Sequence, residues 1–501
     1  MPIKNLICID IKKNGRTFHL SDSEGNQTDV SNAEDLFNFL LLNAEKPNTA
    51  KACWNLFQLF AILDALLPKE VTEKIIKEDR SFFGDYKIFS SSGKVLSIGF
   101  KKHLHDNFYA SRIEVNIYGL RQYFPDDNIN DLYGLKSKGD ELMNTLKELG
   151  WETNTLSSAI AIYDDAVLEK EFIPSVYDME DTEEVDGMLD YAYKLMCREW
   201  RSIYKIGNFT NAIDIDIISG YPSFIKDFGN TSECDIQYSK KLIKSDFGIC
   251  KGIVHINKDY SPIVNPNGQN VIGSYEDYIT TEQWAYIIHY GIGSFDMEDG
   301  YFLNFYDKED KPFFDLMTNQ YNMREHGGLR KTLAKNISVG IYGYQSQEYP
   351  EKYGNYFNPI YSVMTTSRCS LKIGKLIEEF NLKDNLISVT VDGLLTTKDI
   401  ELDTTKQIGG WKKEKVDALI LSCGHQYITN HANENKKDTY QNTYDKMITE
   451  INNHPNKVIY NNVLLNKNMS QTNRLFRNFP KNGRELSEKI YTSEPICVGE
   501  K

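Results

Sequence analysis

Two aspartates in separate parts of the chain lie where buried strands are expected to end. Asp216 is near the end of the β-branched run 212–218, which the turn 219–223 follows, and Asp392 starts the Asp-Gly step in the segment 386–397. Asp-Gly between apolar runs is typical of a β-hairpin. Carboxylates at strand ends can hold two Mg²⁺ ions about 4 Å apart, which stabilise the attacking and leaving oxygens of a phosphoryl transfer. Mg²⁺ is usually held by one or two carboxylates together with substrate phosphates.

A pair of lysines could complete such a site. Residues 329–342 have helical spacing, which puts Lys331 and Lys335 one turn apart on one face. Cations facing the carboxylates could neutralise a triphosphate, so the residues are compatible with nucleotidyl transfer. Each feature alone has a simpler interpretation: a turn or capping aspartate, a solvated lysine face and a hairpin turn. Their order and spacing together favour the chemical interpretation.

The elements that must position these residues can be read from the apolar spacing. Strands are expected at 3–11, 95–100, 113–118, 212–218 and 386–397, the last as a hairpin, and helices at 33–44, 54–67, 188–204, 329–342 and 358–380. Residues 178–190 hold seven acids and no base, which is typical of a solvated helix N-terminus.

Length and charge limit the class of protein. The 501 residues predict about three domains, and 41% hydrophobic with 26% charged residues is globular composition, which excludes wholesale disorder. The net charge of −14 argues against a simple basic coat for nucleic acid. The segment 401–501 nevertheless carries +3 against −17 for the rest, so a local basic surface remains open.

The cysteines and the N-terminus indicate a location. Eight scattered cysteines form no Cys-x-x-Cys pair, so a structural zinc site is not expected and a reducing cytoplasm is. The N-terminus does not have the pattern of a signal peptide, and no run reaches about 18 apolar residues. We therefore expect a cytoplasmic protein with no membrane partner, and a monomer.

The segment Asp216-Ile217-Ile218-Ser219-Gly220-Tyr221-Pro222-Ser223 resembles motif A of the family B DNA polymerases, Asp-x-x-Ser-Leu-Tyr-Pro-Ser, with Gly220 at the Leu. The resemblance is greatest to the compact protein-primed type of phages and linear mobile elements. Lys335, Tyr342 and Gly343 match motif B, Lys-x3-Asn-Ser-x-Tyr-Gly, while Val339 and Gly340 replace Asn and Ser.

Motif C of that family, Tyr-x-Asp-Thr-Asp-Ser, is only partly present. Asp392 matches its second Asp, Thr390 stands at the first and Gly393 at the Ser. This departure implies weakened catalysis rather than lost metal binding. The segment 408–414 is similar to Leu-Gly-x-Trp-x-x-Glu, and 425–427 resembles Lys-x-Tyr with His425 at the Lys. Residues 204–207 are a weak match to the linker Tyr-x-Gly-Gly.

The resemblance implies a role for each matching residue. The metal ligands would be Asp216, Asp392 and the carbonyl of Ile217, with two Mg²⁺ or Mn²⁺ ions as cofactors. The catalytic residues would be Asp216, Asp392 and Lys335. The incoming nucleotide would contact Ile217, Ser219, Tyr221, Arg324, Lys331, Lys335, Tyr342 and Gly343, and Tyr221 would exclude a 2′-hydroxyl. DNA would contact Trp411, Lys412, Lys413, His425 and Tyr427.

The N-terminal third resembles the family's 3′–5′ exonuclease domain without its carboxylates. Asp10 matches the first ligand, whereas Lys12, Leu59 and Cys197 stand where the other three acids would be. A two-metal site cannot be built from Asp10 alone. We expect an exonuclease-like fold without exonuclease activity. The aligned segments could instead belong to another α/β domain.

Together the resemblance implies an α+β multidomain protein with a right-hand polymerase architecture. An RNase H-like domain, 1–200, would precede palm and fingers at 201–398, with an insertion at 228–320 and fingers at 321–345, and a thumb at 399–501. A second insertion, between motifs B and C, is expected to be truncated, because only Tyr344 to Asn358 is available for it.

The expected activity is template-directed addition of dNTP to a 3′-hydroxyl, with primer-template DNA as partner. Priming by a terminal protein is implied by the resemblance only. Two alternatives remain: a non-catalytic polymerase-like protein that binds nucleic acid or a partner, and untemplated or protein-primed nucleotide addition.

Overall fold

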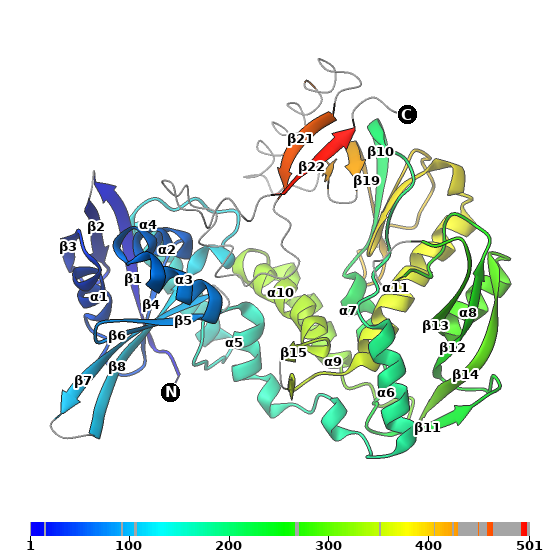
Figure 1. The fold of residues 1–501 in the computed structure, drawn as a ribbon, viewed down its shortest axis with the longest axis horizontal. Helices are drawn as coiled ribbons and strands as arrows, with labels where there is room; N and C mark the ends of the chain where they lie inside the picture. The colour runs from blue at the N-terminus through cyan, green and yellow to red at the C-terminus, as the bar shows by residue number, and fades with distance from the viewer. Residues whose placement is uncertain are drawn as a thin grey trace. The chain divides into compact units, whose positions relative to one another are not determined.

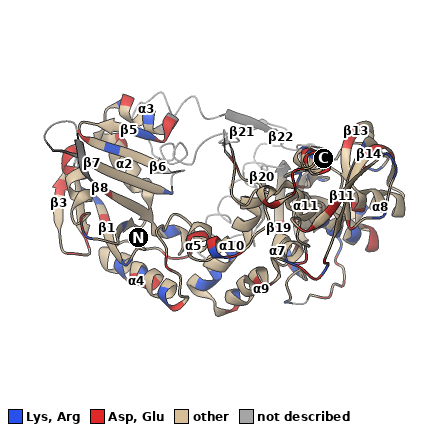
Figure 2. Ribbon diagram, turned by 90° about the horizontal axis from the view of Figure 1, so that it is seen from below, with Lys and Arg blue, Asp and Glu red and all other residues tan. Residues whose placement is uncertain are grey.

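The computed structural model describes residues 2–14, 17–91, 94–104, 108–265, 270–349, 352–404, 406–422, 425–428, 449, 458–463 and 492–497. The chain forms two compact units (Figure 1). The first comprises Met1–Glu171, His326–Leu333 and Tyr460–Pro495, and the second comprises Phe172–Glu325, Ala334–Ile459 and Ile496–Lys501. Acidic and basic residues are interspersed along the elements of both units (Figure 2).

The first unit is built on an eight-stranded mixed sheet with the strand order β3-β2-β1-β4-β8-β7-β6-β5. Strand β4 pairs in parallel with β1 and β8, and the other neighbours are antiparallel. The strands are β1 Asn5–Asn14, β2 Thr17–Asp22, β3 Gln27–Val30, β4 Thr49–Cys53, β5 Arg80–Phe83, β6 Tyr86–Ser91, β7 Val95–Leu104 and β8 Phe108–Gly119.

Helices cover this sheet because alternate strand residues are apolar on both faces. Ile9 on β1 packs in one core with Leu36 and Phe37 of the first helix and Phe60 of the second, whereas Cys8 points to the other face, against Gly139. The helices of the unit are α1 Ala33–Leu41, α2 Leu56–Leu66, α3 Lys69–Glu78, α4 Leu132–Glu148 and α5 Ala159–Ala166, with 3-10 turns at Leu120–Gln122 and Leu168–Lys170.

The second unit contains a six-stranded sheet with the order β20-β19-β10-β18-β17-β9. Its strands are β9 Arg201–Ile203, β10 Gly207–Ile217, β17 Leu386–Thr390, β18 Gly393–Thr396, β19 Trp411–Ser422 and β20 His425–Ile428. The central strand β10 is antiparallel to both β18 and β19. Ile213, Ile215 and Ile217 form a core with helix α11 (Pro359–Glu379) on one face, and a smaller apolar cluster lies on the other.

A four-stranded antiparallel sheet, β11-β14-β12-β13, occupies the segment 228–320 that was predicted to be an insertion. Its strands are β11 Cys234–Ser239, β12 Phe247–Ile256, β13 Gly273–Thr280 and β14 Gly293–Phe305, and helix α8 (Thr281–His289) packs on them. Thr280 and Gln283 form a capping box that begins α8.

The remaining helices of the described residues are α6 Glu183–Leu195, α7 Gly220–Ile225, α9 Phe314–Met323 and α10 Gly328–Gln345, with 3-10 turns at Val176–Asp178, Arg324–His326 and Lys383–Asn385. The remaining strands are β15 Glu348–Tyr349 paired with β16 Lys352–Tyr353, and β21 Val458–Val463 paired with β22 Thr492–Cys497. None of the described helices has the length and hydropathy needed to cross a bilayer.

The expected elements are confirmed with two corrections. Helix α6 does begin inside the acid run, where Glu183, Glu184 and Asp186 form its first turn and Thr182 caps it. It ends at Leu195, however, and 201–203 form strand β9, because pairing with β17 outweighs local helix spacing. The hairpin turn lies at Val391 and Asp392, one residue before the expected position, and Gly393 already pairs with Asp216.

Candidate active site

Asp216 lies on the central strand of the six-stranded sheet, one residue before the end of β10. Its cross-strand neighbours are Gly393 on β18 and Lys412 on β19. Oδ1 of Asp216 is 2.0 Å from the position that a Cβ on residue 393 would take. Any side chain there would displace the carboxylate, so the glycine that departs from motif C makes room for Asp216.

Asp392 lies in the tight turn between β17 and β18, directly beside that glycine. The turn is fixed by two backbone hydrogen bonds, from Val391 N to Trp200 O (2.8 Å) and from Ile217 N to Asp392 O (2.9 Å). A Cβ on residue 220 would lie 2.8 Å from Cβ of Asp392. The replacement of the motif A Leu by Gly220 is therefore explained by the close approach of Asp392. The strands thus bring Asp216 and Asp392 to adjacent positions at one end of the sheet.

The electrostatic surroundings of Asp392 favour a cation. Burial raises the pKa of Asp392, the Glu199 and Asp214 carboxylates raise it further, and Lys335 lowers it. A half-buried carboxylate that other acids destabilise is a suitable ligand for a hard divalent ion. No group of three or more His, Cys, Asp or Glu side chains able to hold a metal occurs in the described part of the chain. The donor set therefore fits Mg²⁺ only with substrate oxygens as further ligands.

The short helix α7 carries the candidate nucleotide gate. The gate residue is Tyr221. Its ring packs against the ring of Tyr342 on α10, with the two centroids 4.3 Å apart and an interplanar angle of 50°. The Tyr221 hydroxyl donates to the Glu199 carboxylate. Burial and the nearby Glu199 charge raise the pKa of Tyr221. The hydroxyl therefore stays protonated and can keep donating.

Arg324 reaches the same turn. Its Nη1 donates to the Ser219 hydroxyl, and Ser219 adopts left-handed backbone geometry (φ 54°) before α7. Burial lowers the pKa of Arg324, and its Nε is buried without a hydrogen-bond partner among the described residues. A half-buried guanidinium retains donors beyond its one bond to Ser219, and such donors are suited to an anion. The structure thus brings Arg324 and Ser219 together.

Helix α10 supplies the predicted cations. Lys335 is exposed and lies within electrostatic range of Asp392, and Lys331 is exposed one turn earlier on the same helix. Gly343 has open space where a Cβ would be. That these residues contact a nucleotide, and that the carbonyl of Ile217 ligates a metal, remain predictions.

The predicted DNA contacts belong to strands β19 and β20 of the six-stranded sheet. Lys412 pairs with Glu414 (2.9 Å) and Lys413 with Asp399 (3.0 Å), and Lys372 lies 5.1 Å from the centroid of Trp411. The side chains of His425 and Tyr427 lie outside the described residues. Most of 429–501 does as well.

The four predicted remnants of an exonuclease site lie in different surroundings. Asp10 and Lys12 share one face of β1 and form an ion pair of 3.3 Å in the first unit. Leu59 is on α2 and fully buried in the core of the first unit. Cys197 belongs to the second unit, where its Sγ is 4.0 Å from the Tyr342 hydroxyl.

Two residues near the site were not found by motif. Glu199 precedes β9 and is itself in no motif, and the pairing of β9 with β17 brings it to the site. Lys372 lies on the largely buried α11, one turn after Arg368, and donates to the carbonyl of Gly409. A polar residue at that helical spacing was a usable signal for Lys372.

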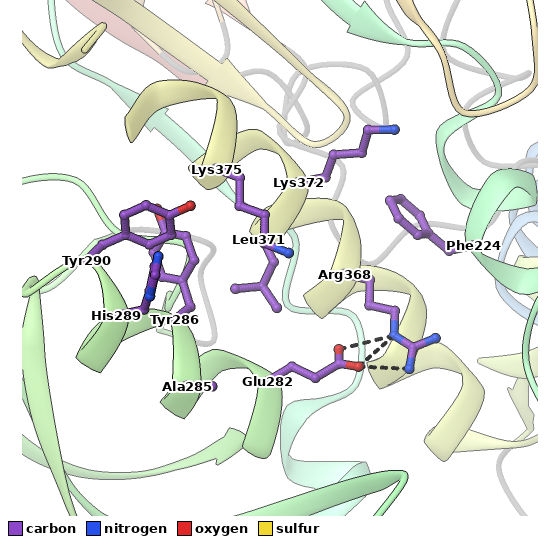
Figure 3. A pocket seen from close by; sticks show the side chains of 10 residues that line it. All are labelled: Phe224, Glu282, Ala285, Tyr286, His289, Tyr290, Arg368, Leu371, Lys372 and Lys375. Atoms are coloured by element: carbon purple, nitrogen blue, oxygen red, sulfur yellow. Dashed lines mark hydrogen bonds and ion pairs between the residues drawn. The ribbon is translucent and has the colours of Figure 1, made fainter. Parts of the chain in front are cut away.

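A pocket of about 760 Å³ lies between helices α8 and α11 (Figure 3). Its lining includes the exposed Lys375, the aromatic rings of Tyr286 and Tyr290, and Arg368, which forms a bidentate ion pair with Glu282. Burial lowers the pKa of Lys372 at its rim. Phe224 of α7 also lines the pocket.

Comparison with known proteins gives a likeness of fold. No protein-family profile matches the sequence, and no curated protein matches it. Phi29 DNA polymerase in complex with primer-template DNA and incoming nucleotides is similar in structure, with a TM-score of 0.56, 13% identity, and coverage of 86% of this chain and 88% of that one. Phi29 DNA polymerase in an orthorhombic crystal form has a TM-score of 0.55 and 12% identity, with coverage of 86% of this chain and 89% of that one. The right-hand α+β architecture and the resemblance to protein-primed family B polymerases are confirmed as a fold.

Proposed function

From the fold shared with Phi29 DNA polymerase, we propose that this chain is a DNA-dependent DNA polymerase that adds dNTP to a primer hydroxyl. One observation carries the proposal: the structure gathers motif residues from β10, α7, the β17–β18 turn and α10 around one point. A fold alone does not determine an activity. The placement of Asp216, Asp392, Tyr221, Arg324 and Lys335 at one site supports this one.

Each side chain has a task in this reaction. Asp216 and Asp392 would hold two divalent ions, which when bound supply the positive charge that phosphoryl transfer requires. Lys335 and Arg324 would bind the triphosphate and orient its α-phosphorus toward the primer hydroxyl. The Tyr221 ring, packed on Tyr342, would lie beneath the sugar and exclude a 2′-hydroxyl. Primer-template DNA would lie along β19, with Trp411 and Lys412 nearest to Asp216.

Primer extension tests the proposal. The wild-type chain should extend a primed template with four dNTPs and Mg²⁺. Asp216→Asn and Asp392→Asn should each lower the rate by at least about 10²-fold, because each removes a charge that the transition state needs. Asp384→Asn, an exposed acid beyond the sheet, is the matched control and should leave the rate unchanged.

The outcomes separate the alternatives. Extension that Asp392→Asn leaves intact contradicts the assignment of the site. Products without template indicate untemplated addition, and binding of DNA without any product indicates a non-catalytic polymerase-like protein. The replaced motif positions Thr390, Val339 and Gly340 are what favour that last alternative.

We also propose that the first unit has no 3′–5′ exonuclease activity. The support is that the Lys12 ammonium lies against the one remaining carboxylate and that Leu59 is a core residue. A labelled single strand incubated with Mg²⁺ and without dNTP should keep its length. Shortening that Asp10→Ala abolishes would show an active site and contradict this part.

A further inference from the structure

Glu199 lies at the candidate gate although no motif marks it. Its Oε1 accepts the Tyr221 hydroxyl, and its Oε2 pairs with Arg201. Both carboxylate oxygens therefore have defined partners, and the carboxylate joins the gate tyrosine to strand β9. The side chain is only 22% exposed.

The backbone on both sides holds Glu199 in place. Before it, Arg198 Nη1 donates to both carboxylate oxygens of Asp277 on β13, at 2.8 and 2.9 Å. After it, the Trp200 ring is fully buried and its Nε1 donates to Asn270 (3.1 Å), while its carbonyl accepts from Val391. With both neighbours anchored, Glu199 has little freedom to turn away from Tyr221.

Tyr221 is thus held from two sides. The Tyr342 ring packs against its face and limits rotation about the Cβ–Cγ bond, and the Glu199 carboxylate fixes the hydroxyl, which lies on that bond's axis and sets where the ring points. The Glu199 carboxylate also lies within electrostatic range of Asp392 and Cys369, and this charge would act alike on the insertion of a dNTP and of an NTP.

We infer that Glu199 is a positioning residue that sets the discrimination between deoxyribonucleotides and ribonucleotides by locking the Tyr221 ring. The inference rests on the proposed function. A hydrogen bond between a hydroxyl and a charged carboxylate is among the stronger ones in proteins. A gate that excludes one hydroxyl group must hold its ring to within a fraction of an ångström, because the selected difference is a single atom.

The test is the ratio of kcat/KM for a dNTP to that for the matching NTP in single-nucleotide insertion. Glu199→Ala should lower this ratio about tenfold. Tyr221→Phe, which removes the hydroxyl and keeps the ring, should lower it by the same factor. The double variant should lower the ratio no further than either single variant, because both substitutions remove the same hydrogen bond.

Two variants serve as controls. Glu199→Gln retains an oxygen that accepts the hydroxyl, so its ratio should stay within about threefold of wild type. Arg201→Ala removes the other partner of Glu199 and leaves the Tyr221 contact, so it should also keep the ratio. An unchanged ratio in Glu199→Ala, or additive losses in the double variant, would overturn the inference.

A second measurement does not depend on activity. With 3-fluorotyrosine at position 221, the ¹⁹F resonance should shift and sharpen in Glu199→Ala as the ring gains motion, and should remain near its wild-type position in Glu199→Gln. If the wild type inserts no nucleotide at all, the proposed function fails and this resonance still tests the contact. If the wild type is active and selective and Glu199→Ala equally so, only the inference fails.

Discussion

Asp392 is kept where its own ionised form is disfavoured. Its pKa in the folded protein is raised above the unfolded value, so the folded state binds that proton more tightly, and ionisation reduces stability as the pH rises through the raised pKa. The ionised Asp392 that the proposed reaction needs therefore lowers the stability of the folded protein.

We therefore predict that Asp392→Asn raises the melting temperature of the metal-free protein while it removes activity. Thermal unfolding at pH 7 in EDTA measures this, and Asp384→Asn should show no change. Mg²⁺ together with dNTP should stabilise the wild type more than Asp392→Asn. A lower melting temperature in the variant would show that its carboxylate contributes to folding.

Two of the departures from the family motifs have a steric explanation at single residues. Gly220 and Gly393 departed from motifs A and C in the sequence, and the structure gives both a steric reason at the carboxylates. The sequence alone could not supply that reason, because it depends on a register between strands about 180 residues apart. Thr390, by contrast, pairs with Arg201, and nothing in the structure explains its replacement of an acid.

Among the elements, β4 contains a lysine where a buried strand would be apolar. Lys51 is fully buried and donates to the carbonyl of Phe39 (3.3 Å). Burial lowers its pKa to about 8, and Asp22 and Glu24 partly offset this effect. Below pH 8 the lysine is charged in both states, and the charged form lowers stability by about 3 kcal/mol. The free energy of unfolding therefore increases as the pH rises from about 8, the folded pKa of Lys51, to the unfolded pKa near 10.4.

Lys51→Met should therefore stabilise the first unit at pH 7, by roughly 1 to 3 kcal/mol. The gain should shrink at pH 9.5, where the wild-type lysine is neutral in the fold. Urea unfolding at the two pH values measures both, with the exposed Lys74→Met on α3 as control. Equal gains at both pH values would show a packing effect instead of a charge effect.

At the scale of elements, periodicity was a sufficient guide where an element buries one continuous face. Helix α11, expected at 358–380, runs from Pro359 to Glu379, with Asn358 as its cap. Strand β9 was missed because its three residues become a strand only through β17. Glu199 was missed for the same reason, since its position follows from a long-range pairing and not from its neighbours in sequence.

For the whole molecule, the charge of −14 predicts strong dependence of DNA binding on salt. A protein of this net charge must attract DNA through a few local cations, because its overall field repels phosphates. Binding of a primed hairpin, followed by fluorescence anisotropy, should weaken about 10²-fold or more between 50 and 200 mM salt. An affinity that salt leaves unchanged would mean that the contacts are not to phosphates.

The strand order β19-β10-β18 has a consequence for how the chain is made. On the ribosome, β10 emerges about 200 residues before β19. Until then its two edges lack the strands that pair with them, and its isoleucines lack the core that covers them. At 5 to 20 residues per second this interval lasts roughly 10 to 40 s. The carboxylates of the site cannot meet before then. Translation speed and chaperone capture in that interval would therefore govern the yield of active protein more than the final stability does.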